Sequence, residues 1–153
     1  PINGFIKTHV METIRSKLWV HLVLIHAHNL KPLKAQENIL LDQDIRMASL
    51  KYGMVTEAVH IMPGHVHILI QLPFYKSLPE AVRWLKQTAT RWLKGNGLAH
   101  NGFTWQKGFN AFSVSASQLP AVRKYIKTQP LLHMRRSFDE EMEVWIRRYD
   151  LIA

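Results

Sequence analysis

The chain has 153 residues and a formal net charge of +9, and it contains no cysteine. This length predicts one domain and excludes an eight-stranded α/β barrel, which needs about 250 residues. The lack of cysteine excludes disulfide scaffolds, thiolate metal sites and cysteine nucleophiles, so any metal must be held by nitrogen and oxygen ligands. The basic charge favours a polyanionic partner, either nucleic acid or an acidic membrane surface, over an unspecialised basic surface.

The longest apolar runs, such as Leu22 to Ile25, are far shorter than the roughly 20 residues of a membrane span. No signal-peptide pattern opens the chain. We therefore expect a soluble intracellular protein.

The first half of the chain predicts three strands and one helix. Residues 1–16 show no clean period and form an N-terminal extension of uncertain structure, and a strand follows over residues 19–28. A helix is predicted over residues 36–52, because apolar side chains recur at helical spacing and Gly53 is suited to cap its end. The β-like residues 54–62 and the strand 65–72 flank a Pro-Gly turn signal, which predicts a hairpin.

The second half predicts three helices and one further strand. Ser77-Leu-Pro-Glu80 is a capping box that opens a helix to about Lys94, and residues 109–115 are β-like. Gln118-Leu-Pro begins a helix that Pro130 must stop near Gln129. A second capping box, Ser137-Phe-Asp-Glu140, opens a terminal helix within 137–153.

The resulting order, β-α-β-β-α-β, is that of a ferredoxin-like α+β fold. We expect an antiparallel sheet with helices on one face plus added C-terminal helices. The whole chain, residues 1–153, is then interpreted as one domain.

Two histidines one residue apart open the predicted strand 65–72. Side chains alternate in a strand, so His65 and His67 project together while Val66 and Ile68 project to the other face. Two converging imidazoles suit a metal ion, although such a pair also occurs as half-buried hydrogen-bonded groups. A second pair, His26 and His28, is interpreted as lying at the surface or facing a phosphate, and His21 and His60 are interpreted as structural.

Tyr125 and Gln129 are four residues apart on the predicted helix after the fourth strand, so they share one helix face. Most tyrosines at such a position are core-edge side chains with the hydroxyl in water. Spacing alone leaves open whether Tyr125 is one of these or a catalytic residue.

Basic residues gather on two predicted helices, and one of these helices also carries two tryptophans. Trp84 and Trp92 are interleaved with the cations of helix 77–94, and either tryptophan could equally belong to the core. Cations pair with phosphates and aromatic rings stack on bases, so this mixture favours single-stranded or irregular nucleic acid over a membrane. The candidate DNA-binding residues are Arg83, Lys86, Arg123, Lys124, Lys127, Arg135 and Arg136.

The segments "MPGHVHILI" and "FNAFSVSASQLPAVRKYIKTQ" together resemble the HUH single-tyrosine transposases of insertion sequences, where HUH denotes His, a hydrophobic residue and His. The resemblance runs from about Trp19 to Gln129. The segments "WQKGFNAFSVS" and "HMRRSFDEEME" look like the branch associated with repetitive extragenic palindromes. Motif order, the gap of about sixty residues and the Tyr-x-x-x-Gln ending agree, which makes the resemblance specific.

The resemblance implies a DNA transposase that cuts and rejoins single-stranded DNA near hairpins. Tyr125 would be the nucleophile that forms a 5′-phosphotyrosine link and releases a 3′-hydroxyl. His65, His67 and Gln129 would hold Mg²⁺ or Mn²⁺ as the cofactor. The resemblance also implies a homodimer and a cytoplasmic, nucleoid-associated prokaryotic protein.

Three positions depart from the family pattern. Gly64 stands where the family usually has Asp, Pro130 follows Gln129, and the stretch before Trp19 has no counterpart that we can place. Two alternatives stay open: a rolling-circle replication initiator or relaxase, and a domesticated DNA-binding module that no longer cleaves.

Overall fold

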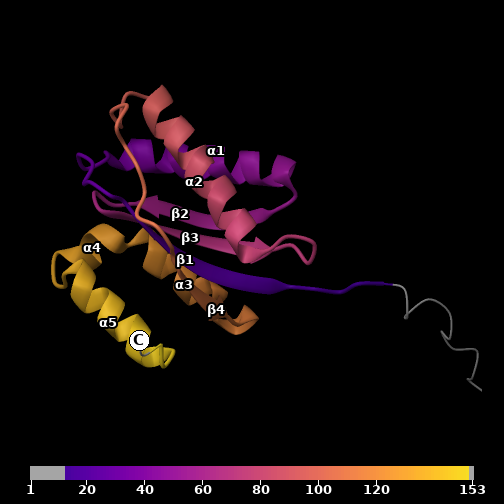
Figure 1. The fold of residues 1–153 in the computed structure, drawn as a ribbon. Helices are drawn as coiled ribbons and strands as arrows, with labels where there is room; N and C mark the ends of the chain where they lie inside the picture. Colours follow the sequence, from indigo (N-terminus) through magenta and orange to yellow (C-terminus); the bar gives the residue numbers. More distant parts are fainter. Residues whose placement is uncertain (1–12, 152–153) are drawn as a thin grey trace, which may run out of the picture.

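The computed structural model describes residues 13–151, and its centre is a four-stranded antiparallel sheet with the strand order β2-β3-β1-β4 (Figure 1). The strands are β1 (Leu18–Ile25), β2 (Val55–Ile61), β3 (His65–Leu72) and β4 (Asn110–Val114). The helices are α1 (Ala35–Tyr52), α2 (Leu78–Gly95), α3 (Leu119–Lys127), α4 (Gln129–His133) and α5 (Phe138–Arg148), with a short 3-10 turn, η1 (Ala116–Gln118). This confirms the predicted ferredoxin-like order.

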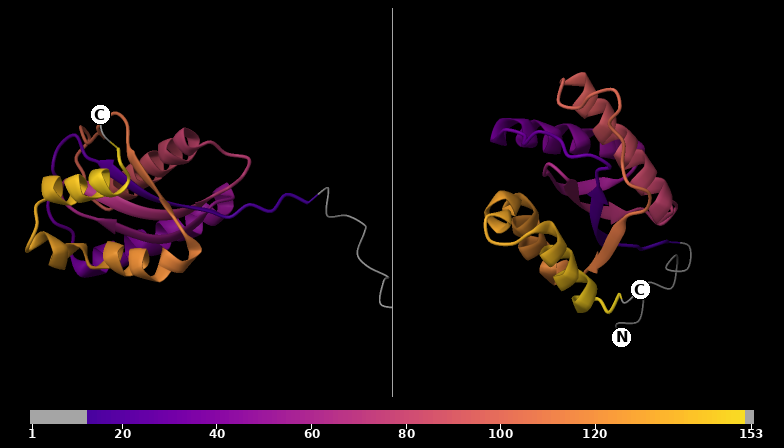
Figure 2. Two further views of the ribbon diagram at one scale, coloured as in Figure 1. Left: turned by 90° about the horizontal axis from the view of Figure 1, so that it is seen from below. Right: turned by 60° about the vertical axis from the view of Figure 1, so that its left-hand side comes forward.

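The sheet lies between two helical layers. Helices α1 and α2 cover one face, and α3, α4 and α5 lie along the other, as the right-hand view of Figure 2 shows. The predicted arrangement, helices on one face plus C-terminal helices, is therefore confirmed. Residues 13–17 contain no helix or strand, and the rest of the predicted N-terminal extension, residues 1–12, lies outside the described residues.

Strand alternation gives the two faces of the sheet different chemistry. On β3, Val66, Ile68 and Ile70 are fully buried in the larger core beneath α1 and α2. Their neighbours His65 and His67 turn to the opposite face, under α3 and α5. Burial of the apolar set at about 25 cal/mol per Å² fixes the register, because a slip of one residue would exchange the two faces.

The helices of the first layer begin and end as predicted. Gly53 has φ 84° and donates to Ser49 and Leu50, so it caps α1 in the left-handed conformation. Ser77 Oγ accepts a hydrogen bond from the Glu80 amide at 3.3 Å, which confirms the capping box of α2.

Both tryptophans of α2 contact α1. Trp84 stacks on Tyr52 with ring centroids 4.5 Å apart, and Trp92 Nε1 donates to Asp44 Oδ2 at 2.6 Å. These contacts favour the core interpretation, since both indoles join the two helices of one layer.

The first His-x-His pair corrects one prediction. Strand β1 ends at Ile25, and His26 forms only an isolated bridge to Trp105. His26 is 3% exposed and its Nδ1 donates to the Pro63 carbonyl at 2.9 Å, so the surface interpretation is wrong for this residue. His28 is exposed.

Candidate functional site

His65 and His67 stand at the centre of the face under α3 and α5. Their side chains are 5% and 0% exposed, and the ring centroids are 5.0 Å apart. The period of the strand places both imidazoles on this face, as predicted.

Backbone hydrogen bonds hold the turn before His65 in place. The carbonyl of Gly64 accepts from the His26 amide at 2.9 Å, and the carbonyl of Pro63 accepts from the Leu30 amide at 2.7 Å. A Cβ at Gly64 would come 3.0 Å from Asn29 Oδ1, so an acidic side chain here would have to displace Asn29. The loop after β1 thus holds the start of the histidine strand through backbone hydrogen bonds.

Tyr125 and Gln129 reach the histidines from two helices rather than one. Helix α3 ends at Lys127, and Thr128 interrupts it with φ −102° and ψ 18°. Pro130 then occupies the first turn of α4, where its missing amide breaks no helical bond. The predicted helix does end near Gln129, at Lys127, but the chain then resumes as a short helix that was not predicted, α4, with Gln129 as its first residue.

Both side chains nevertheless arrive at the histidine pair. The Tyr125 ring lies edge-on to His67 with centroids 5.7 Å apart. Gln129 is fully buried, and its Oε1 accepts from His133 Nε2 at 2.9 Å. The structure thus brings together the four residues predicted for catalysis and metal binding.

Glu141 on α5 is the functional residue that sequence reasoning missed. It is 1% exposed, and its Oε1 accepts hydrogen bonds from the Tyr125 hydroxyl and, at 2.9 Å, from Gln129 Nε2. The same oxygen lies 3.3 Å from His67 Nε2, and Oε2 lies 3.9 Å from His65 Nε2. One carboxylate therefore contacts the tyrosine and both histidines.

A signal for Glu141 exists in the sequence. The buried or half-buried residues of the last helix and its C-cap are Phe138, Glu141, Met142, Trp145 and Tyr149, which follow a helical stripe. An acid inside an apolar stripe is rarely buried without a partner. The segment "HMRRSFDEEME", which resembles the palindrome-associated branch, contains Glu141, but no role was predicted for it, and the neighbouring Glu140 accounted for the capping box.

His21 and His133 complete the surroundings. His21 Nε2 lies 2.8 Å from His67 Nδ1, a hydrogen bond in which one ring donates and the other accepts. His133 Nε2 lies 3.1 Å from Glu141 Oε2. His21 was interpreted as structural. Its hydrogen bond fixes the orientation of the His67 ring, so that Nε2 of His67 faces Glu141.

The site keeps its histidines neutral and its carboxylate charged. Burial, followed by the charge of His67, lowers the pKa of His65 to about 3, and burial lowers the pKa of His21 and His67 in the same direction. Burial alone would raise the pKa of Glu141, but the close His67 imidazole and the hydrogen bonds from Tyr125 and Gln129 lower it to about 2. Neutral imidazoles beside an ionised carboxylate are the protonation states that bind a cation.

The pKa of Tyr125 is raised, whereas the pKa values of the buried histidines and Glu141 are lowered. Burial and then the hydrogen bond to Glu141 raise the pKa of its phenol above the ordinary value of 10, against the weaker effect of the Trp145 indole. The Trp145 Nε1 donates to the phenol oxygen at 2.9 Å. The site without a cation therefore favours the neutral phenol, and added positive charge is needed to favour the phenolate.

We predict that the metal-free protein loses stability in mild acid. Above pH 6.5 these histidines are neutral in both the folded and the unfolded chain. Below pH 6.5 they become protonated in the unfolded chain but stay neutral in the folded chain, down to the folded pKa of about 3 for His65. Each such histidine lowers the free energy of unfolding by about 1.4 kcal/mol per pH unit in this window. Urea unfolding with a chelator at pH 7.5 and 5.5 measures the loss, and equal midpoints would contradict it.

The residues at this point fit a divalent cation. Three of the buried atoms that lack a hydrogen bond within residues 13–151 meet here: His65 Nε2, His67 Nε2 and Glu141 Oε2. One ligand atom from each of these residues lies within 4.8 Å of the others. Two imidazoles and a carboxylate are ligands that Mn²⁺ and Mg²⁺ accept, with the imidazoles favouring Mn²⁺.

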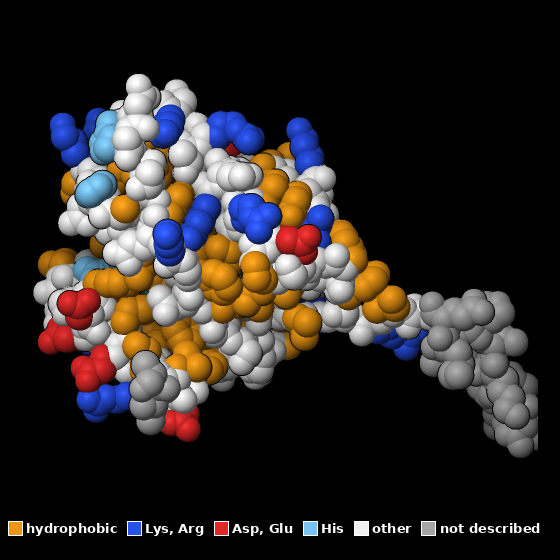
Figure 3. Space-filling view, in the orientation of Figure 1, with side chains coloured by type: hydrophobic (Ala, Val, Ile, Leu, Met, Phe, Trp, Pro, Cys, Tyr) orange, Lys and Arg blue, Asp and Glu red, His pale blue; other side chains and the backbone are white. Residues whose placement is uncertain are grey.

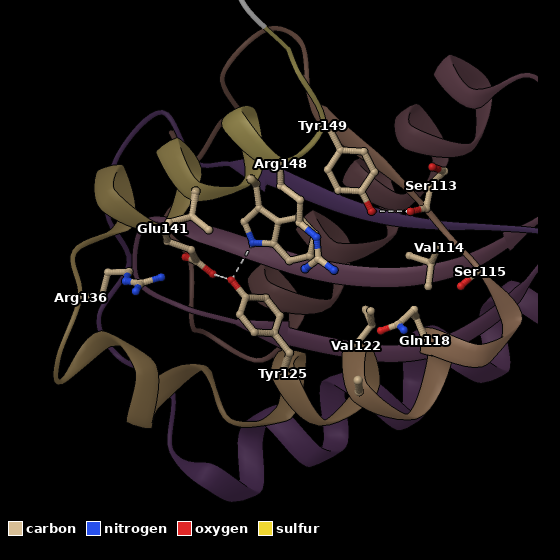
Figure 4. Close-up of a pocket in the computed structure, with 13 residues that line it drawn as sticks. Ser113, Val114, Ser115, Gln118, Val122, Tyr125, Arg136, Glu141, Arg148 and Tyr149 are labelled. Carbon is tan, nitrogen blue, oxygen red and sulfur yellow. Dashed lines mark hydrogen bonds between the residues drawn. The ribbon is translucent and has the colours of Figure 1, made fainter.

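A groove leads from the surface to Tyr125 and Glu141. It lies between α3 and α5, has a volume of about 530 Å³, and continues past Trp145 to Ser113, Ser115 and Gln118 (Figure 4). Near its far end the Tyr149 hydroxyl donates to the Ser113 carbonyl at 2.6 Å.

The predicted DNA-binding cations divide between the two layers. Arg83 and Lys86 belong to α2, on the face of the sheet away from Tyr125. Lys86 Nζ donates to the carbonyls of Gln106 and Gly108 at 3.0 and 2.8 Å, so it also fixes the long loop before β4. Figure 3 shows Lys and Arg side chains spread over the upper part of the molecule, where α1 and α2 lie.

The remaining cations are carried by α3 and the turn after α4. Lys124, Lys127, Arg135 and Arg136 are exposed, and Arg136 lines the groove. Arg123 is half-buried and pairs with Glu57 at 3.0 Å, which reduces the charge it can offer to a ligand. Arg83 and Lys86 thus lie apart from the tyrosine site, whereas the other five lie in the helical layer that carries Tyr125, and of these Arg136 lines the groove.

Two strand histidines, a helix tyrosine and an amide side chain thus meet at one point of the structure. A family model described as "Transposase IS200 like" matches residues 14–129, and the chain belongs to this family. The match begins five residues before Trp19, so the stretch directly before that residue does have a family counterpart. A comparison with curated proteins found no match.

Two solved structures are similar in fold. One, from Deinococcus radiodurans R1, is described as a transposase; it is 21% identical, has a TM-score of 0.54, and the alignment covers 76% of this chain and 93% of that chain. The other is a REP-associated tyrosine transposase bound to a REP hairpin, 16% identical with a TM-score of 0.54, covering 80% of this chain and 73% of that chain. Within residues 13–151, no helix is long and apolar enough to cross a membrane.

Proposed function

We propose that this transposase cleaves and rejoins single-stranded DNA near hairpins through a 5′-phosphotyrosine intermediate. The observation that carries the proposal is the placement of the Tyr125 hydroxyl at the His65/His67 pair, joined to it by Glu141. A domesticated module without cleavage would not require this complete set.

His65, His67 and Glu141 would hold the divalent cation, with the Gln129 amide oxygen as a further ligand. When bound, Mg²⁺ or Mn²⁺ supplies positive charge to the scissile phosphate and to the phenol oxygen. The chain itself orients this set, since His21 holds the His67 ring and His133 contacts Gln129 and Glu141.

The cleavage step uses groups that already touch one another. Glu141 accepts the phenol proton along the existing hydrogen bond, and the Tyr125 oxygen bonds to phosphorus. The bond from phosphorus to the 3′ oxygen breaks, and that oxygen takes up a proton, which Glu141 can return. Rejoining is the reverse, with a DNA 3′-hydroxyl as the attacking group. Trp145 Nε1 holds the tyrosine in line throughout.

The DNA partner is supported by the net charge of +9 and by the family. A hairpin is supported by the likeness to the REP-associated tyrosine transposase, whose structure holds a REP hairpin. We propose the seven cations named above as its phosphate contacts, and residues 1–153 as one catalytic domain.

We predict a strong salt dependence of DNA binding. If several of these cations neutralise phosphates, the association constant should fall by at least about tenfold between 50 and 200 mM salt. Fluorescence anisotropy with a labelled hairpin measures it, and an affinity that does not change with salt would remove the basic helices from the DNA surface.

A homodimer, expected from the resemblance, also stays a proposal. All groups of the site come from one chain here, because Tyr125 contacts Glu141 and His67 of its own chain. Light scattering combined with cleavage by mixtures of Tyr125 and His67 variants tests sharing of sites. Recovery of activity in the mixture would show that a tyrosine serves the partner's site.

The proposed function is tested with a pool of single-stranded hairpin DNAs and Mn²⁺. We expect a protein–DNA adduct that survives denaturant, together with a fragment whose 3′ end terminal transferase can extend. A replication initiator would instead show cleavage at a plasmid-type origin hairpin, and a domesticated module would bind without forming an adduct.

A further inference from the structure

We infer that the groove between α3 and α5 binds one nucleotide of the DNA single strand, the nucleotide joined to the phosphate that Tyr125 attacks. The inference rests on the proposed function and adds a substrate subsite to it. No residue of this groove other than Tyr125 and Arg136 was a candidate on sequence grounds.

The first support is access to the nucleophile. His65 and His67 are 4% and 0% exposed, so no phosphate reaches them from the open surface. Tyr125 is half-buried, and both Tyr125 and Glu141 line the groove. A strand whose phosphate meets the tyrosine must therefore place adjoining atoms in this groove.

The second support is the size and apolar lining of the groove. Its volume of about 530 Å³ lies within the range of about 300 to 1,000 Å³ that is usual for small-ligand sites. Val114 and Val122 form buried parts of its wall, while Ala121 and Val144 are exposed along it. Such walls suit the flat, weakly polar faces of a nucleic-acid base.

The third support is the placement of polar groups at the two ends. In Figure 4, Arg136 lies beyond Glu141 at the tyrosine end, and Ser115 and Gln118 lie at the other end. Hydroxyl and amide groups both donate and accept hydrogen bonds, which suits a base edge, and a guanidinium suits a phosphate.

Arg148 supplies a second cation above the middle of the groove. Its guanidinium stacks over the Trp145 ring, 5.6 Å from the ring centroid, and it forms no ion pair with any acid of residues 13–151. Its neighbour Arg147 points elsewhere and pairs with Glu143. The two arginines thus have equal charge and adjacent positions, and only Arg148 lines the groove.

This pair gives a matched test. The probe is a 5′-fluorescein-labelled single-stranded deoxythymidine decamer with Mn²⁺ present, and its affinity is measured by anisotropy across a salt series. We expect Arg148→Gln to weaken binding by about tenfold and to reduce the logarithmic salt slope by about 0.7, the value for one lost phosphate contact on a single strand. Arg147→Gln should stay within about twofold of the wild type.

A second variant blocks the groove without removing charge. Ala121→Trp places an indole where the base would lie, and we expect binding to fall by about tenfold, in line with the loss of one stacked base. Gln87→Trp, at an exposed position of α2, is the control and should bind as the wild type. Circular dichroism melting verifies that each variant is folded.

Photo-crosslinking locates the strand directly. A decamer with 5-iodouracil in place of thymine should crosslink to the peptide that contains Trp145 and Tyr149. Equal weakening by Arg147→Gln and Arg148→Gln, wild-type binding by Ala121→Trp, or a crosslink confined to α2 would each overturn the subsite.

The adduct assay separates this inference from the proposed function. If the wild type forms the tyrosine adduct while the groove variants bind and cleave normally, the subsite is wrong and the function stands. If no hairpin DNA yields an adduct while Arg148→Gln and Ala121→Trp lose strand binding, the subsite stands and the cleavage proposal fails.

Discussion

Replacing Tyr125 with Phe is expected to abolish the covalent protein–DNA adduct and to lower strand cleavage by at least about 10³-fold. The change removes only the hydroxyl that would attack phosphorus and that Glu141 and Trp145 now hold. DNA affinity should stay within about twofold, because phosphate contacts dominate binding. The free energy of unfolding should fall by about 1 kcal/mol, since the Trp145 Nε1 loses its acceptor.

Peptide mapping of the wild-type adduct completes this experiment. Tyr149→Phe is a matched control, because its hydroxyl also lies beside the groove but bonds to the Ser113 carbonyl rather than to Glu141. An adduct that maps to Tyr52, Tyr75 or Tyr149, or that still forms in the Tyr125 variant, would show that another residue is the nucleophile.

Replacing His67 with Ala is expected to remove cleavage and to leave hairpin binding largely intact. The change deletes one of the three buried atoms that face the proposed cation, and binding of Mn²⁺ should weaken by about 100-fold or more. Electron paramagnetic resonance of Mn²⁺ measures this directly without relying on activity. His65→Ala should behave in the same way.

His28→Ala is the control for these histidine changes, because this side chain is exposed and lies outside the site. Glu141→Gln separates the roles of the carboxylate, since the amide keeps the volume and loses the charge. Full cleavage in excess chelator, or wild-type Mn²⁺ binding by the His67 variant, would refute metal dependence at this point.

The sequence predicted the fold well where local signals agree with packing. The helices of the first layer were located to within a residue or two, because capping residues and the apolar period point to the same ends. Two ends fell short of the predicted ones. Strand β1 ends at Ile25 because its partner β3 begins opposite it at His65, and Thr128 divides a helix whose apolar stripe runs on past it.

The candidate site was predicted only in part. Strand alternation alone placed His65 beside His67, and the resemblance added Tyr125 and Gln129. Glu141 was missed because it lies beyond the matched residues, on a helix whose docking onto the sheet no local pattern encodes. His21 was missed as a partner of His67 for a similar reason, since their contact depends on the register between β1 and β3.

The hydrogen bond between Tyr149 and Ser113 has a consequence beyond the groove. Strand β4 is the last strand of the sheet, and its outer backbone groups are a template for pairing with a strand of another molecule. The Tyr149 hydroxyl already donates a hydrogen bond to one carbonyl of β4, that of Ser113. The residue directly after α5 therefore shields this edge from self-association. A displacement of α5 that widened the groove would also expose the edge, and opening of the site would then be detectable as aggregation that increases with protein concentration.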